Sequence, residues 1–106
     1  MVYSAGMTSY TVVLAPEPHS TRYTVSCPAM PGMNTFGEDR DGAIRMAQEA
    51  MSLWLEVAVE HGEAPLEETP ELIAGEIAFV LGWKAEEGWP LLVETVLISI
   101  PVPVAA

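Results

Sequence analysis

Two segments near the start of the chain carry the residue pattern of β-strands. Residues 8–16 are rich in β-branched and aromatic side chains, a composition that favours extended backbone. Across residues 22–27 apolar and polar side chains alternate, as they do in a strand with one buried face. Residues 17–21 between them contain the proline and hydroxyl groups typical of a turn. The pattern therefore predicts an antiparallel hairpin, followed by a short third strand over residues 33–37.

The hydrophobic period changes from two to that of a helix after Asp39. From Ala43 to Ala58 apolar residues recur three or four positions apart, and polar residues occupy the opposite side. Asp39 is a favourable N-cap, and Gly62 readily adopts the left-handed conformation that ends a helix. These signals predict one amphipathic helix over residues 40–61.

A second helix and a final strand are predicted in the last third of the chain. Residues 69–88 begin with a threonine cap and with Pro70, which suits the first helical position. Residues 91–104 are largely apolar on both faces, which indicates a strand covered on two sides, by the domain or by another copy of the chain. Pro101 and Pro103 lack the N–H that a central strand needs, so this strand is expected at a sheet edge.

Element order and length together predict a single α+β domain. The chain has 106 residues, the size of one ordinary domain. The order strand–strand–strand–helix–helix–strand indicates a small antiparallel sheet with both helices packed on one side. We expect a disordered leader over residues 1–7, a core of hairpin, third strand and long helix over residues 8–62, and the second helix and C-terminal strand over residues 69–106.

The charge balance indicates what kind of partner the chain can bind. It has 15 acidic residues against 4 Lys and Arg, a net charge of −11, so it lacks the clustered cations that direct nucleic-acid binding requires. Glutamates are frequent between Met46 and Trp83, where Lys and Arg do not occur. Such a surface attracts a basic protein at long range, although it can also serve solubility alone. The residues expected to contact a basic partner are Glu56, Glu60, Glu67 and Glu68.

The sequence offers little for catalysis. Its one cysteine, Cys27, lies in a predicted strand, and His19 and His61 have no ligand or base pattern around them. We therefore expect no catalytic residue, no metal and no cofactor. A lone cysteine cannot form an intramolecular disulfide, and we find neither a signal-peptide pattern nor the roughly 20 apolar residues that cross a membrane. A soluble, cytoplasmic protein is expected.

The segment after the second predicted strand resembles the HicB family of toxin–antitoxin antitoxins. The family pattern is a strand leading into Pro-x-hydrophobic-Pro-Gly, then Thr-x-Gly-acidic, and then a helix. The matching residues are Pro28, Met30, Pro31, Gly32, Thr35, Gly37 and Glu38. The resemblance extends over residues 9–62 and includes the long amphipathic helix.

This resemblance implies both a fold and a function. The implied fold is a degenerate RNase H-like core that has lost nuclease activity. The implied function is that of a non-catalytic antitoxin domain, a dimer or tetramer that binds a small basic HicA-like toxin and neutralises its mRNA cleavage by occlusion. The residues themselves also favour self-association, through the C-terminal strand and its edge position. The expected oligomer contacts are Val96, Ile98, Ile100 and Trp89.

Two alternative functions stay open. The first is a solitary oligomeric domain of this family that binds an unknown ligand between its subunits. The second is a metal-dependent RNase H-like nuclease, which would use Glu38, Asp39 or Asp41 together with Glu94, the acidic residue on a predicted strand.

Overall fold

Six elements make up the fold, in the order that the sequence predicts. A computed structural model describes residues 6–103. The elements are β1 (Met7–Pro16), β2 (Tyr23–Ser26), β3 (Asn34–Gly37), α1 (Arg40–Glu60), α2 (Pro70–Glu87) and β4 (Glu94–Pro101). This confirms the α+β class and the element order. Of the predicted leader, residues 1–5 lie outside the described residues, and Met7 already belongs to β1. No helix within residues 6–103 is long and apolar enough to span a membrane.

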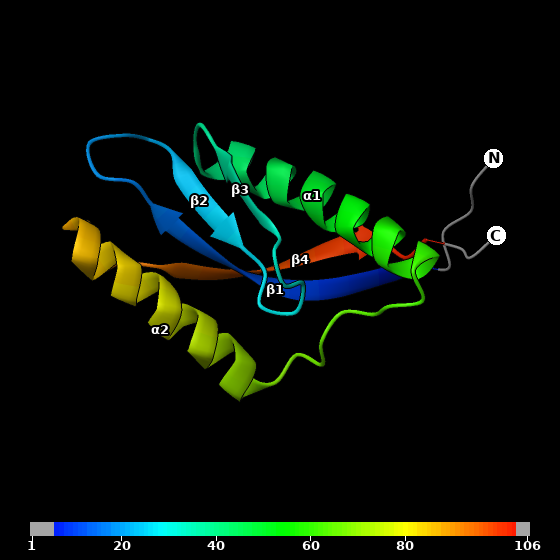
Figure 1. The fold of residues 1–106 in the computed structure, drawn as a ribbon. Helices are drawn as coiled ribbons and strands as arrows, with labels where there is room; N and C mark the ends of the chain where they lie inside the picture. The colour runs from blue at the N-terminus through cyan, green and yellow to red at the C-terminus, as the bar shows by residue number, and fades with distance from the viewer. Residues whose placement is uncertain (1–5, 104–106) are drawn as a thin grey trace.

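The four strands form one antiparallel sheet in the order β3-β2-β1-β4 (Figure 1). The long central strand, β1, pairs with β4 from Met7 opposite Pro101 to Leu14 opposite Glu94. Its other side pairs with the much shorter β2 only from Val13 onward. β4 is therefore an edge strand, as its prolines predicted.

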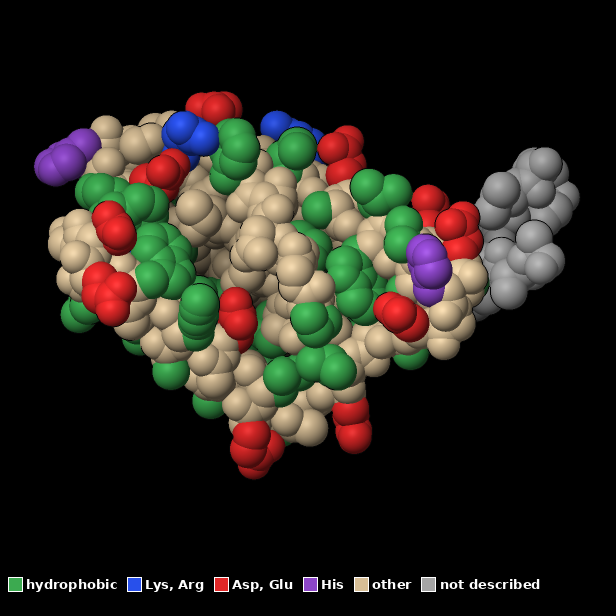
Figure 2. Space-filling view, in the orientation of Figure 1, with side chains coloured by type: hydrophobic (Ala, Val, Ile, Leu, Met, Phe, Trp, Pro, Cys, Tyr) green, Lys and Arg blue, Asp and Glu red, His purple; other side chains and the backbone are tan. Residues whose placement is uncertain are grey.

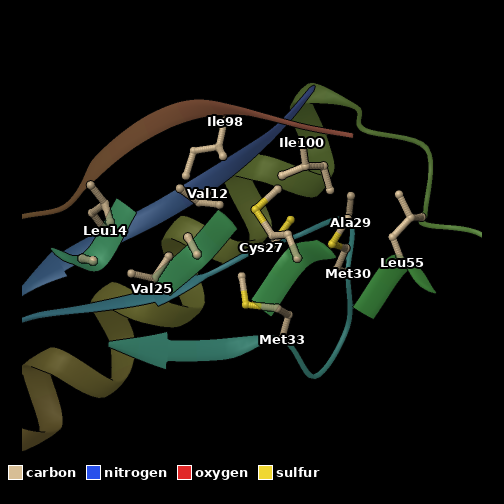
Figure 3. Packing of buried hydrophobic residues seen from close by; sticks show 13 residues of the cluster. Val12, Leu14, Val25, Cys27, Ala29, Met30, Met33, Leu55, Ile98 and Ile100 are labelled. Atoms are coloured by element: carbon tan, nitrogen blue, oxygen red, sulfur yellow. The ribbon is translucent and has the colours of Figure 1, made fainter. Parts of the chain in front are cut away.

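Helix α1 covers one face of the sheet and builds the larger core. Val12 and Leu14 of β1 pack there with Ala47 and Met51 of α1, all of them fully buried. Figure 3 shows side chains from the strands and from the loop after β2 gathered in this space. A Cβ at Gly37 would lie 2.1 Å from the Ala43 backbone nitrogen. Close packing of α1 on the end of β3 therefore requires glycine at this position.

Helix α2 lies on the opposite face, so the expectation that both helices share one side is wrong. Val13 and Ala15 alternate along β1 with the residues that face α1, and they pack with Val80 of α2. Figure 1 shows the two helices on opposite sides of the sheet. The physical reason is the uninterrupted apolar run from Val12 to Ala15, in which every side chain is buried. A strand without polar alternation needs a cover on each of its faces.

A buried lysine fixes the C-terminal end of α2. The Lys84 side chain is fully buried, and its Nζ donates hydrogen bonds to the backbone oxygens of Pro16, at 3.4 Å, and Leu92, at 2.5 Å. Burial lowers the pKa of this amine below its ordinary value. Lys84 thus links α2 to the end of β1 and to the segment before β4.

Candidate protein-binding surface

The four glutamates predicted to bind a partner occupy two neighbouring segments. Glu56 and Glu60 are exposed on the C-terminal half of α1, and Glu67 is exposed in the linker between the helices. Glu68 is only partly exposed, because its carboxylate accepts a hydrogen bond from the Thr11 backbone N–H at 2.5 Å. Three of these carboxylates are therefore free to meet a partner, whereas Glu68 has a structural partner on β1.

A surface groove with a volume of about 810 Å³ is formed by the helix and the linker that carry these acids, although none of the four lines it. We call it the α1–linker groove, because α1, the loop after β2 and the linker between the helices form its walls. Its lining residues are Pro31, Gly32, Met33, Asn34, Ala50, Leu53, Trp54, Val57, Ala58, Glu63, Ala64 and Leu66. Leu53 is 62% exposed, Leu66 47% and Val57 44%. Large apolar side chains exposed together are typical of protein-interaction sites.

The groove exists because α1 has two apolar stripes. Ala43, Ala47, Met51, Leu55 and Ala58 form the buried stripe that packs on the sheet. Met46, Ala50, Leu53 and Val57 form a second stripe, also spaced by three or four residues. Met46, Leu53 and Val57 are exposed, whereas Ala50 is partly buried against the core. The second stripe can be recognised in the sequence, but the prediction of a helix with a single apolar face overlooked it.

Two hydrogen bonds fix the walls of the groove. The Trp54 indole Nε1 donates to the backbone oxygen of Pro31 at 3.1 Å, which ties the loop to α1. The Leu66 N–H donates to the backbone oxygen of Ala29 at 2.8 Å, which ties the linker to the same loop. Ala29 and Met30 are fully buried, so the loop is anchored in the core. A groove built in this way is preformed, which lowers the entropic cost of binding.

The charge around the groove has one sign. Glu63 lines it, Glu56 and Glu60 lie on the same part of α1, and its lining residues include no Lys or Arg. Figure 2 shows hydrophobic side chains near the C-terminal end of α1 with acidic side chains around them. An apolar floor with a negative rim suits a partner segment that carries apolar side chains between Lys or Arg residues.

A second groove, of about 450 Å³, lies between α2 and strands β2 and β3. Phe36 and Phe79 are its most exposed aromatic residues, at 48% and 60%. Arg22 lies over the Phe36 ring, 4.4 Å from its centroid, and its Nε is 3.2 Å from Glu17 Oε2. The lining of this groove carries both signs of charge. The α1–linker groove is therefore the better match to a strongly basic partner.

The carboxylates considered for a nuclease have other roles. Asp39 caps α1, accepting a hydrogen bond from the Gly42 N–H at 2.7 Å. Glu94 accepts hydrogen bonds from Arg40, whose Nε lies 3.0 and 3.2 Å from its two oxygens; they lower the pKa of the Glu94 carboxyl. Glu38 and Asp41 are exposed. Across residues 6–103, no three His, Cys, Asp or Glu side chains are grouped so that they could hold a metal ion.

The residues predicted at an oligomer interface face mainly into their own chain. Ile98 and Ile100 are 3% and 1% exposed in the α1-side core, and Val96 packs against the same core. Trp89 is partly buried and packs edge-on against Trp83, with ring centroids 4.9 Å apart. The exposed residues of β4 are Thr95, Leu97, Ser99 and Pro101.

The fold and this surface define a class, a small α+β domain with an exposed apolar groove between its long helix and the linker. A sequence model described as the HicB_like antitoxin of bacterial toxin-antitoxin system matches residues 10–78. This chain belongs to that HicB-like antitoxin family, which confirms the resemblance found in the sequence.

A solved structure supports the same fold. A chain of a toxin–antitoxin complex from Streptococcus pneumoniae matches with a TM-score of 0.64, over 92% of this chain and 71% of that chain. The two sequences are 19% identical, so the likeness shows the fold alone. No curated protein matches the chain.

Proposed function

We propose that this domain is the antitoxin of a toxin–antitoxin pair and neutralises a small, basic, mRNA-cleaving toxin of the HicA-like kind. The observation that carries the proposal is the α1–linker groove, which combines exposed apolar side chains with a negative rim. The family membership of the chain supports the antitoxin role. In this proposal the domain itself performs no catalysis.

Neutralisation by occlusion follows from elementary electrostatics. A protein that cleaves RNA has to present Lys or Arg side chains to the phosphates. An acidic domain that docks on those cations competes with the RNA and covers the surface on which cleavage takes place. The glutamates then set the rate and orientation of association. Burial of Leu53 and Val57 supplies the apolar part of the affinity.

The test compares one substitution in each groove. The chain is co-expressed with a short, Lys- and Arg-rich candidate toxin, and the binding affinity and residual RNA cleavage are measured. Leu53→Asp, in the α1–linker groove, is expected to weaken binding at least about tenfold, because it places a charge on an apolar contact. Phe79→Asp is the matched control, since Phe79 is 60% exposed and Leu53 62%. If Phe79→Asp weakens binding and Leu53→Asp does not, the assignment to the α1–linker groove is wrong.

A second pair of variants separates binding from solubility. Glu56→Lys and Glu60→Lys are expected to slow association with the toxin and to reduce its dependence on salt, because charges on this rim steer a cationic partner. Unchanged association rates would mean that these acids serve solubility alone. Mg²⁺-dependent RNA cleavage by the isolated chain, lost in Glu94→Gln, would contradict the whole proposal in favour of a nuclease.

A further inference from the structure

The second groove, between α2 and strands β2 and β3, has the features of a small-molecule site. Its volume of about 450 Å³ lies near the lower end of the range for ligand pockets. Of the strands, α2 packs mainly on β1, where Val80 packs with Val13 and Ala15. The same face of β2 and β3 is therefore left as the floor of the groove.

A buried hydroxyl without a partner lies in this floor. Ser26 is opposite Val13 in the β1–β2 register and therefore faces α2. The residue is only 9% exposed, and its Oγ has no hydrogen-bond partner. A buried polar group in this state costs folding free energy, so natural proteins rarely keep one without a reason. The hydroxyl can rotate, and it can both donate a hydrogen bond to a ligand and accept one.

The other buried side-chain atoms that lack a hydrogen bond also belong to this groove. Within residues 6–103 they are Glu17 Oε2 and Arg22 Nε, and both residues are part of the lining. The two atoms are 3.2 Å apart, and the same Nε is 3.8 Å from Glu38 Oε1. Two carboxylates thus balance the charge of Arg22. The remaining charge in the lining is that of Glu76.

One stripe of α2 forms the helical wall of the groove. Glu76, Phe79, Val80 and Trp83 all line it, and their spacing of three or four residues places them along one side of the helix. Glu76 forms no ion pair with a Lys, Arg or His of residues 6–103. A carboxylate without a cation, beside aromatic rings on the same helix face, is suited to an organic cation.

A ring of this groove already holds a cation. Phe36 of β3 is opposite Thr24 in the β2–β3 register, on the α2 side of the sheet. The guanidinium carbon of Arg22 lies 4.4 Å from the centroid of the Phe36 ring, within the range of a cation–π contact. The aromatic part of the lining is therefore favourable for positive charge.

Glu76 lies near the end of β2 that carries Ser26. It is one helical turn from Val80, which packs with Val13, the residue opposite Ser26. Burial is the main cause that raises the pKa of the Cys27 thiol, next to Ser26 in the chain, and the Glu76 carboxylate is one of the charges that raise it further. A small ligand can therefore reach both the carboxylate and the hydroxyl.

We propose that the second groove binds a small aromatic amine in its protonated form. The ammonium group would donate hydrogen bonds to the Glu76 carboxylate and the Ser26 hydroxyl. The ring of the ligand would pack against Phe79 and Trp83. An anionic ligand is disfavoured, because it would meet Glu76 on a chain whose net charge is −11.

Three matched probes test the charge of the ligand. Phenethylamine, phenethyl alcohol and phenylpropionate carry the same ring on a short chain that ends in a positive, a neutral or a negative group at neutral pH. In an NMR titration of the amide signals, the amine is expected to bind at least about fivefold more tightly than the alcohol, because its hydrogen bonds are charge-assisted. The largest shifts should come from Thr24, Ser26 and Phe79. An amine that does not bind, or an alcohol or acid that binds as tightly, would overturn the proposal.

A pair of glutamate variants tests the residue that meets the charge. Glu76→Gln should weaken binding of phenethylamine at least about fivefold and leave binding of the alcohol unchanged. Glu86→Gln is the matched control, since Glu86 is an exposed carboxylate of α2 that does not line the groove. Unchanged amine binding in Glu76→Gln, or equal weakening in Glu86→Gln, would contradict the assignment.

Ser26→Ala tests the buried hydroxyl by two measurements. Binding of phenethylamine should weaken about threefold, because one hydrogen bond to the ligand is lost. The free energy of unfolding, measured by urea denaturation, should not fall, because the hydroxyl has no partner in the folded chain. A loss of stability with unchanged amine binding would show that the hydroxyl has a structural role and takes no part in the site.

A Lys or Arg side chain of a protein partner offers similar chemistry, and competition distinguishes it from a small amine. The candidate toxin should bind without displacing phenethylamine, because Leu53 and Phe79 line different grooves. Displacement would show that a protein cation occupies the second groove and would overturn the assignment to a small molecule.

This inference does not rest on the proposed function, and the experiments separate the two. Leu53→Asp should lose toxin binding and keep amine binding, whereas Glu76→Gln should do the reverse. Failure of toxin binding alone would contradict the proposed function, and failure of amine binding alone would contradict the small-molecule site.

Discussion

The two helices cover opposite faces of one sheet but are held there in different ways. Helix α1 buries Ala43, Ala47 and Met51 completely, so that small side chains bring its backbone close to the strands. Helix α2 buries only Val80 and Lys84, and its Phe79 is 60% exposed. The α1 face is thus a close-packed core, whereas on the α2 face only a few buried side chains hold the helix on the sheet. We expect the α2 face to open at a lower free energy than the α1 face.

The largest effect is expected from a glycine on the α1 face. Gly37→Ala places a methyl group where a Cβ would lie 2.1 Å from the Ala43 backbone nitrogen, so α1 has to move away from β3. The free energy of unfolding should fall by about 4 kcal/mol or more, the range of severe core strain. Urea denaturation measures this change.

The matched control is a glycine in α2. A Cβ at Gly75 meets no atom within 4 Å, and Gly75 lies inside the helix. Gly75→Ala should therefore raise the free energy of unfolding by about 0.5–1 kcal/mol, because alanine favours helix more than glycine does. Equal destabilisation by both substitutions would remove the distinction between a close-packed face and an open one.

The next effect is a pH dependence that belongs to the α1-side core. Burial raises the pKa of the Cys27 thiol from 9.0 to about 11. Between these values the unfolded chain loses its thiol proton first, so stability falls as the pH rises above 9. The expected loss is about 2 kcal/mol by pH 11, where the folded thiol is itself half ionised, since one pKa unit corresponds to about 1.4 kcal/mol. Cys27→Ala should remove this part of the alkaline destabilisation, measured by urea denaturation from pH 8 to 11.

The pH dependence of the free energy of unfolding has the opposite sign for the buried lysine of α2. Burial lowers the pKa of Lys84, so between its folded value and 10.5 the unfolded chain holds more protons than the folded one. Stability contributed by this group therefore rises as the pH increases through that window. In Lys84→Met this rise in stability with pH should disappear. The free energy of unfolding at pH 7 should also fall by about 1–3 kcal/mol, because the Pro16 and Leu92 oxygens lose their hydrogen-bond donor. A Lys84→Met chain with wild-type stability at every pH would show that the amine does not hold α2.

Local chemistry made most of the fold predictable, and long-range packing explains what was missed. Asp39, Thr69 and Gly88 all lie at the helix ends, as residue types that cap helices should. The position of α2 was missed because the run of four buried residues in β1 was not recognised as a strand covered on both faces.

The candidate site was predicted less completely than the fold. The acidic character of the α1 surface could be predicted from charge alone, and Glu56 and Glu60 are exposed on the helix that forms one wall of the groove. The groove itself depends on contacts between distant segments, such as the Trp54 indole with Pro31. The burial of Lys84 also could not be predicted, because a lysine in the last turn of a helix normally stays in solvent and complements the helix dipole.

The smallest effect tests whether only a few side chains hold α2 on the sheet. Phe79 and Val80 are neighbours on the helix, yet Phe79 is 60% exposed and Val80 only 5%. Phe79→Ala should change the free energy of unfolding by no more than about 0.5 kcal/mol, as surface substitutions do. Val80→Ala should cost about 2 kcal/mol, because it removes buried methyl groups between α2 and β1. If the larger loss came from Phe79→Ala, the exposed side of α2 would have to be covered in the folded protein, and the contrast between the two faces of the sheet would disappear.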